Sequence, residues 1–251
     1  MAKKSRTPMP PRNVQAPRPR AGGGNDDLAR RNRIILFALA GSGVGLLIVV
    51  VAYIALSGGG KSNTGGTKGV SDGNVAPLMK TAACTFKTVT AYLPKGQNMH
   101  LQSLTAKFPW NTDPPSNGQH YPLWAVWGFY TEPVNPRQVV HNEEHGGVIL
   151  WWGTKVSQAT VDQLRTFYNE QPDGVFGTPY AKLGTKVAIT DWTGDTSKYQ
   201  VNGYYGQGHI GVCPSFNAAT KTAFEAFRNA YRGHGPEGIP LSADEPGMGP
   251  G

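Results

Sequence analysis

The groups best suited to chemistry lie in one short segment of the chain, His141-Asn-Glu-Glu-His145. Two imidazoles and two carboxylates fall within five residues, and Gly146-Gly147 and the apolar run Val148 to Trp152 follow at once. Glycines let a backbone turn sharply or approach a ligand closely, and the apolar run has the β-branched and aromatic composition of a core strand. The pattern indicates a polar site mounted on a buried strand.

Histidines from several segments could meet at this site and bind a transition metal. Neutral imidazoles suit zinc, copper and nickel, and Glu144 would complete the ligand set or orient one of the ligands. Met99 and Met248 would add the soft sulfur donors that Cu(I) prefers. The simpler alternative is that each histidine only hydrogen-bonds to backbone in a turn. The candidate ligands are His100, His120, His141, Glu144, His145 and His209.

The same segment also satisfies H-x-x-E-H, the signature of zinc hydrolases in which Glu144 would be the general base. That motif functions on a helix, where His141 and His145 share a face. Pro136 upstream and Gly146-Gly147 downstream disfavour a stable helix. Zinc-dependent hydrolysis is therefore the weaker hypothesis, and the sequence predicts metal binding without a catalytic residue.

Tryptophans provide a competing hypothesis that needs no metal. Aromatic rings offer rigid, amphipathic contact area, so they could line a groove for a glycan or an extended peptide. Such rings more often pack in a core, where alternate side chains of a strand point inward. The candidate groove residues are Trp124, Trp127, Trp151 and Trp152.

The basic charge of the chain lies in its first 33 residues. Residues 1–33 hold nine Lys and Arg against two Asp, whereas the remainder carries 15 basic and 14 acidic side chains. The sequence therefore gives no support for nucleic-acid binding by the folded part. Few large apolar residues occur in this segment, and we expect a disordered, Arg-rich cytoplasmic tail that contacts anionic lipid.

Residues 34–56 carry no charge and are long enough to cross a bilayer as one helix. Five arginines lie between positions 18 and 33, which predicts a cytoplasmic amino terminus and an extracytoplasmic domain on the plasma membrane. Gly41 and Gly45 form a small-xxx-small pair that would allow a homodimer. Residues 57–76 read as a flexible linker rich in Gly and Ser.

We expect one folded domain over residues 77–235 and a Pro- and Gly-rich irregular tail over 236–251. The apolar patterns predict an α+β fold with a mostly antiparallel sheet and two main helices. One helix would start at Thr160 with a capping box, and the other near Asn217. The predicted strands are 124–130, 148–152, 186–192 and 208–213.

Cys84 and Cys213 are the only two cysteines. Both follow the predicted membrane span, and an oxidising compartment favours a disulfide between them. Paired thiolates that bind a metal or act in redox chemistry are the alternative.

Characteristic segments span nearly the whole predicted domain, namely Cys84, 96–100, 114–120, 124–130, 140–147, 160–170, 177–180, 208–213 and 227–233. Together they resemble the bacterial domain-of-unknown-function family 3105. The resemblance implies a single-pass membrane protein with a His-containing extracytoplasmic domain, but no activity. Gln119 and Glu143 depart from the family pattern, and we expect Glu143 to be peripheral.

The sequence thus predicts a membrane-anchored protein that binds or delivers a transition metal, copper or zinc. An envelope module that recognises a glycan or peptide, and a zinc hydrolase, are the two alternatives. The expected partners are membrane lipid and a cell-envelope or respiratory protein.

Overall fold

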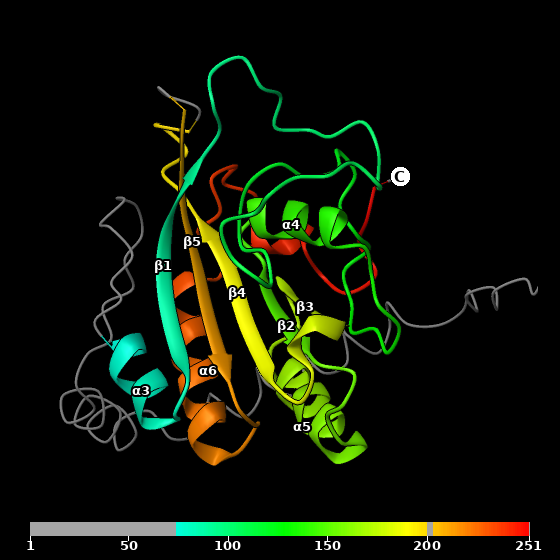
Figure 1. Cartoon of the computed structure of the whole chain (residues 1–251), viewed down its shortest axis with the longest axis vertical. Helices are drawn as coiled ribbons and strands as arrows, with labels where there is room; N and C mark the ends of the chain where they lie inside the picture. Colours follow the sequence, from blue (N-terminus) through cyan, green and yellow to red (C-terminus); the bar gives the residue numbers. More distant parts are fainter. Residues whose placement is uncertain (1–73, 200–202, 251) are drawn as a thin grey trace, which may run out of the picture. The chain divides into compact units, whose positions relative to one another are not determined.

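A five-stranded sheet is the framework of the computed structural model, which describes residues 74–199 and 203–250 (Figure 1). The strand order is β1-β5-β4-β2-β3, and every neighbouring pair is antiparallel except β2 and β3. The predicted α+β class with a mostly antiparallel sheet is confirmed. The strands are β1 Thr85–Tyr92, β2 Val148–Trp152, β3 Val175–Pro179, β4 Val187–Thr193 and β5 Tyr204–Cys213.

Three of the four predicted strands are present, as β2, β4 and β5. The fourth, 124–130, is not a strand and makes only a single bridge, between Phe129 and Gly177. Its backbone is bonded elsewhere, because the side-chain amide of Asn142 accepts from the N–H of Ala125 and donates to its carbonyl, both at 2.9 Å. The aromatic composition of this segment therefore reflects packing against its neighbours and not a strand.

Four α-helices accompany the sheet in the described residues, of which α5 and α6 are the two predicted main helices. Asn217 caps α6 as expected, whereas α5 begins earlier than predicted because Ser157 accepts the capping bond from the N–H of Thr160. The first described helix, α3, starts inside the predicted linker, and its Val75 is buried. The bounds are α3 Val75–Thr81, α4 Pro136–Glu144, α5 Gln158–Glu170 and α6 Ala218–Tyr231, with short 3₁₀ helices η2 Ala181–Leu183 and η3 Leu241–Ala243.

Helix α4 contradicts the expectation that 141–145 is not helical. Pro136 occupies the first turn of α4, where proline has no N–H to lose and its fixed φ suits the helix. The preceding Asn135 is the N-cap, and its side chain accepts from the N–H of Arg137. Proline thus begins this helix instead of preventing it. The last helical residue is Glu144, directly before the C-cap His145.

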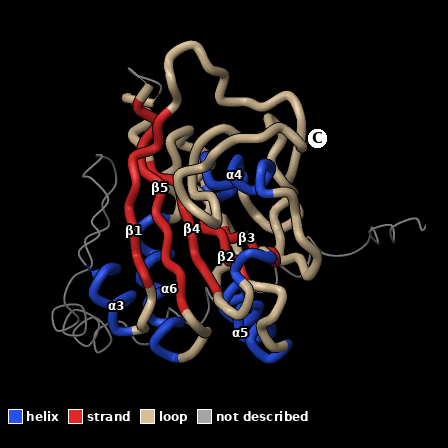
Figure 2. Tube along the Cα trace, in the orientation of Figure 1, coloured by secondary structure: helices blue, strands red, loops and turns tan. Residues whose placement is uncertain are grey.

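Strands β2, β3 and β4 are buried on both faces, whereas the edge strand β1 is largely exposed. Helices α3, α5 and α6 cover one face, where their apolar side chains belong to the same core cluster as Val148, Leu150 and Trp152 of β2. Helix α4 lies on the opposite face with Ile149 and Trp151 (Figure 1). Figure 2 shows long loops around α4. Every residue of β2 is buried, which explains its continuous apolar sequence.

Residues 233–250, which we term the C-terminal strap, are largely irregular, as predicted for the tail, but they pack against the domain. Gly233 N–H donates to the carbonyl of Gly146 at 2.8 Å, and Trp127 N–H donates to that of Met248 at 2.8 Å. A Cβ on Gly146, whose φ is +101°, would lie 2.6 Å from the nitrogen of Gly235. The strap therefore runs in direct backbone contact with the end of α4, and the domain continues past residue 235.

The predicted disulfide is confirmed, because Cys84 and Cys213 are bonded across 129 residues of sequence. It ties the start of β1 to the end of β5, which are hydrogen-bonded neighbours in the sheet. The free-thiolate alternative is thereby wrong.

Within residues 74–199 and 203–250, no helix has the length and apolar character needed to cross a membrane. The predicted cytoplasmic tail, the predicted span at 34–56 and most of the predicted linker lie outside the described residues.

Replacing Cys84 and Cys213 with alanine should lower the free energy of unfolding by about 5 kcal/mol, because the closed loop of 129 residues no longer restricts the unfolded chain. Urea unfolding followed by far-UV circular dichroism measures the change. The wild-type protein unfolded in a strong reductant serves as the matched control and should lose a similar amount. A loss below roughly 1 kcal/mol in both would show that the bridge contributes little.

Candidate metal centre

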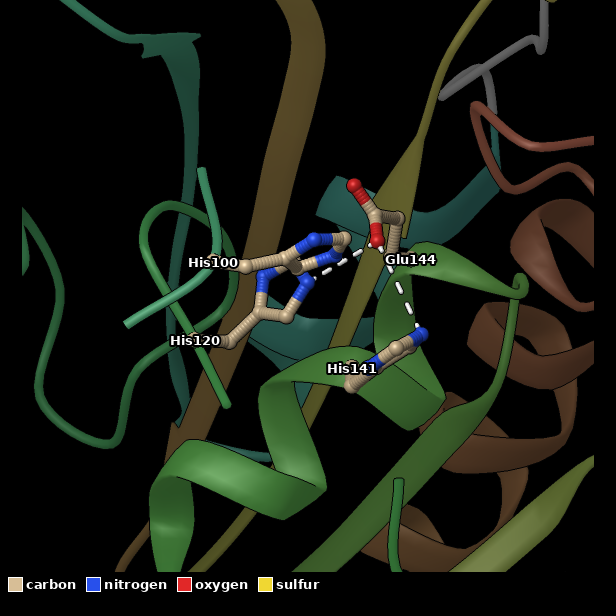
Figure 3. Close-up of side chains that lie close together, drawn as sticks. All are labelled: His100, His120, His141 and Glu144. Carbon is tan, nitrogen blue, oxygen red and sulfur yellow. Dashed lines mark ion pairs between the residues drawn. The ribbon is translucent and has the colours of Figure 1, made fainter. Parts of the chain in front are cut away.

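Four side chains from separate segments meet on the α4 face of the sheet (Figure 3). One ligand atom from each lies within 4.8 Å of the others. Two come from the long connection between β1 and α4, and two come from α4 itself. We term this set the inner group; its members are His100, His120, His141 and Glu144.

The backbone fixes where these side chains lie. His100 and His120 are partners in an isolated parallel bridge, supported by a 3.1 Å bond from the N–H of His120 to the carbonyl of Met99. His141 and Glu144 are three residues apart on α4 and therefore share a helix face. Two chain segments paired in parallel and one helix thus bring the four groups together.

Hydrogen bonds to backbone carbonyls orient two of the imidazoles. His120 Nδ1 lies 2.9 Å from the carbonyl oxygen of Gly118, and His141 Nδ1 lies 2.9 Å from that of Tyr121. Because a carbonyl only accepts, each Nδ1 must donate its proton, and Nε2 is left as the nitrogen that faces the inner group. Carbonyl bonds of this kind are typical of histidines that bind metals.

Glu144 lies at the middle of the inner group. Its Oε2 is 2.9 Å from His120 Nε2 and 3.9 Å from His141 Nε2, and its Oε1 accepts from the hydroxyl of Tyr199. Burial favours the neutral acid, but the hydrogen bond and charge of His120 and the other imidazoles outweigh burial and lower the pKa of Glu144. The carboxylate is therefore ionised at neutral pH.

Two of the histidines are neutral near pH 7. Burial lowers the pKa of His141 to about 3, helped by the charge of His120 and opposed by the carbonyl of Tyr121 and by Glu144. Burial and His120 also lower the pKa of His100, whose Nε2 is buried without a hydrogen-bond partner among the described residues. Neutral imidazoles with a free nitrogen are the form that binds metal ions.

A second set, which we term the outer group, consists of His141, His145 and Glu237, with one ligand atom from each within 4.8 Å of the others. His145 Nε2 lies 3.6 Å from Glu237 Oε2, and His145 Nδ1 lies 3.1 Å from Oδ1 of the buried Asp244. Burial and the charge of Glu144 raise the pKa of Glu237. Both acids belong to the C-terminal strap.

Residues 100–240, more than half of the chain, match the family described as "Protein of unknown function (DUF3105)". The chain belongs to this family. The resemblance inferred from the sequence is confirmed, and the matched region contains every member of the inner and outer groups. No curated protein and no solved structure matches the chain.

His209 is not part of either group in this DUF3105 domain. Its ring nitrogens lie 3.1 Å from the hydroxyl of Thr88 and 2.8 Å from that of Thr193, and its ring stacks on Tyr231 of α6. Tyr231 belongs to the core on the face opposite α4. The prediction that His209 assists His141 and His145 is wrong, because β5 directs its side chain to the other face.

The predicted aromatic groove is also contradicted. Trp127, Trp151 and Trp152 are buried in the two cores, so they offer no surface to a glycan or peptide. Trp124 is partly buried, and its ring lies 4.7 Å from that of His145 and 5.5 Å from that of His141. Its contribution is to pack against the histidines of the outer group.

The departure of Glu143 from the family pattern suggested a peripheral residue, but the structure contradicts this expectation. It is fully buried on the sheet side of α4, where its Oε1 accepts from Thr190, and Trp151 Nε1 donates to the same threonine at 2.7 Å. Burial raises the pKa of Glu143 well above its usual value. A protonated Glu143 supports α4 on the sheet and is not a ligand of either group.

Three residues with a role at the centre were missed, namely Tyr199, Glu237 and Asp244. Tyr199 follows β4 in a loop, and the two acids lie in a segment whose Pro- and Gly-rich composition predicted a tail. The only hint in the sequence was that Glu237 and Asp244 lie among glycines and prolines. That composition is equally typical of a disordered end, so it did not predict a segment that packs against the domain.

Asp191 of β4 is fully buried, and neither carboxyl oxygen has a hydrogen-bond partner among the described residues. Burial raises the pKa of Asp191 well above its usual value in the folded protein. Its contribution to stability is complete below the unfolded pKa of about 4 and is lost as the pH rises toward the folded pKa. The protonated form is thus the one that the fold accepts.

Asp191→Asn should remove this loss of stability at rising pH, because the amide cannot ionise. We expect the variant to gain roughly 1 kcal/mol or more relative to wild type between pH 5 and pH 8, measured by urea unfolding at each pH. The matched control is Asp162→Asn on the exposed side of α5, which should give no such trend. Equal pH slopes for Asp191→Asn and wild type would contradict the assignment.

Proposed function

We propose that this protein binds one divalent transition metal ion, zinc or copper, in the inner group. The observation that carries the proposal is the meeting of three imidazoles and one carboxylate, with ligand atoms within 4.8 Å of one another at a nearly dry position. Bringing so many polar groups out of water is unfavourable unless they are partnered. A cation would partner all four at once.

The donor types favour Zn²⁺ or Cu²⁺ over Cu(I). Three nitrogens and one oxygen suit the divalent ions, whereas Cu(I) prefers sulfur. Both cysteines are held in the disulfide, the side chain of Met248 is 48 % exposed at the surface, and Met99 packs in an apolar cluster with Leu93 and Trp192. We therefore retain the expected copper or zinc site, but we no longer include methionine sulfurs among its ligands or Cu(I) as its ion.

The ligand set of the inner group favours a closed metal-binding site over a catalytic one. Four protein ligands complete a tetrahedral shell, whereas a catalytic zinc keeps one position open for water. His120 and Glu144 are also almost fully buried, which restricts the approach of a substrate. Metal binding, storage or delivery follows from such a shell more readily than hydrolysis.

A zinc hydrolase is the second candidate, and one observation favours it. Residues His141 to Glu144 form the last turn of α4 and His145 is its C-cap, so the H-x-x-E-H motif has the helical setting that it requires. In that case His141 and His145 would bind zinc and Glu144 would act as general base. The burial of Glu144, whose side chain is only 1 % exposed, argues against this role, because a general base must be reached by the water that it deprotonates.

The proposed location is the outer side of the plasma membrane, as expected from the sequence. An uncharged segment at 34–56 would anchor the domain on the outer side of the plasma membrane, where the disulfide is stable. A cell-envelope or respiratory protein would then be the recipient or source of the metal. A homodimer through Gly41 and Gly45 is compatible with this arrangement.

The test is metal analysis of the full chain, purified without an affinity tag that contains histidine. After loading with Zn²⁺ or Cu²⁺ and removal of free ion, wild type should retain close to one equivalent, and His120→Ala should retain almost none. The matched control is His234→Ala, which removes an exposed imidazole outside both groups. At a free metal concentration 100 times the Kd, wild type should gain about 2.7 kcal/mol of stability.

Thermal unfolding of the metal-free proteins shows whether His120→Ala still folds, so that lost binding is not mistaken for lost structure. Wild type that retains neither metal would sink the proposal. Hydrolysis of peptides or esters by the zinc-loaded protein, lost in Glu144→Gln, would instead favour the second candidate.

A further inference from the structure

We propose that the outer group is the position where a metal ion first binds, and that His141 then passes this ion to the inner group. The inference rests on the proposed function and adds a route to it. Its basis is that one residue, His141, belongs to both groups, while the other members of the two groups differ. The two positions are therefore adjacent and share a ligand.

The outer group is a built site and not an accidental cluster. Asp244, itself buried, holds Nδ1 of His145 at 3.1 Å, and this leaves Nε2 to face Glu237 Oε2 at 3.6 Å. A carboxylate behind a histidine fixes its ring and strengthens it as a ligand. Trp124 packs against the same ring, with centroids 4.7 Å apart.

The two groups differ in their access to solvent. The side chain of Glu237 is 32 % exposed, whereas those of His120 and Glu144 are 0 % and 1 % exposed. A hydrated ion can therefore reach Glu237 directly, and a carboxylate at the surface raises the local concentration of cations. Three of the four inner members are buried, and although His100 is half-buried as a residue, its Nε2 is buried.

His141 can bind only one ion at a time. Its Nδ1 donates to the carbonyl of Tyr121, so Nε2 is its single nitrogen available for a metal. An ion at the outer position would hold His141, His145 and Glu237, and on moving inward it would keep His141. Glu237 and His145 would be exchanged for Glu144 and the inner histidines, with no change in oxidation state.

The backbone keeps the two carboxylates side by side for this exchange. The N–H of Glu237 donates to the carbonyl of Glu144 at 3.4 Å, and Gly238 N–H donates to the carbonyl of Gly235. The strap thereby places the outer carboxylate directly beside the residue that carries the inner one. A ligand exchange between them needs no movement of the chain as a whole.

The test compares how fast the metal-free full chain loads with Co²⁺, whose visible absorption reports protein ligands. Glu237→Gln should slow loading by about tenfold, because the exposed negative charge is lost, yet reach the wild-type end point of one equivalent. The matched control, Glu245→Gln, removes an exposed carboxylate of the same strap and should load at the wild-type rate.

His145→Gln is a second variant that should slow loading in the same way, and its thermal unfolding checks that it folds. Loading of both variants at the wild-type rate would overturn the inference while leaving the proposed function intact. Two equivalents of Co²⁺ in wild type would also overturn it, because the positions could then be filled together. Wild type that binds none of Co²⁺, Zn²⁺ and Cu²⁺ would overturn the proposed function and the inference with it.

Discussion

Burial of one polar helix is the constraint on which the rest of this structure depends. Six consecutive residues of α4, from Val139 to Glu144, are buried, and four of them are polar. A buried polar side chain without a partner is costly, so each one determines where another segment must lie. Asn142 binds the backbone of Ala125, Glu143 binds Thr190, His141 binds Tyr121 and Glu144 binds Tyr199. The long loops around α4 are thus ordered by the helix that they cover.

Close backbone contact at the end of α4 explains why the strap belongs to the domain. Gly146 and Gly235 approach so closely that neither has room for a Cβ. Gly146 also has a φ of +101°, which other residues rarely adopt. This contact brings Glu237 and Asp244 next to His145, so two glycines that carry no chemistry determine which acids reach the outer group.

Features whose signals lie close together in the sequence could be predicted from it. Periodicity and caps identified α5, α6, β2, β4 and β5, and the count of cysteines identified the disulfide. Pro136 was misjudged because proline prevents a helix in the interior but favours its first turn, and the sequence alone did not show which position it held. The partners of Asn142 and the packing of the strap lie far away in sequence, and no local pattern encodes them.

The composition of the site was partly predictable because a helix imposes its own angular order. With about 3.6 residues per turn, the residue at i+3 lies roughly 60° to one side of residue i, and that at i+4 lies roughly 40° to the other. Viewed down the axis of α4, His141 therefore lies between Glu144 on one side and His145, the C-cap, on the other. The spacing of H-x-x-E-H places one imidazole between two different neighbours, and the surrounding loops supply His120 on one side and Glu237 on the other. Two groups that share His141 thus follow from the helical period together with the loops that bury the helix.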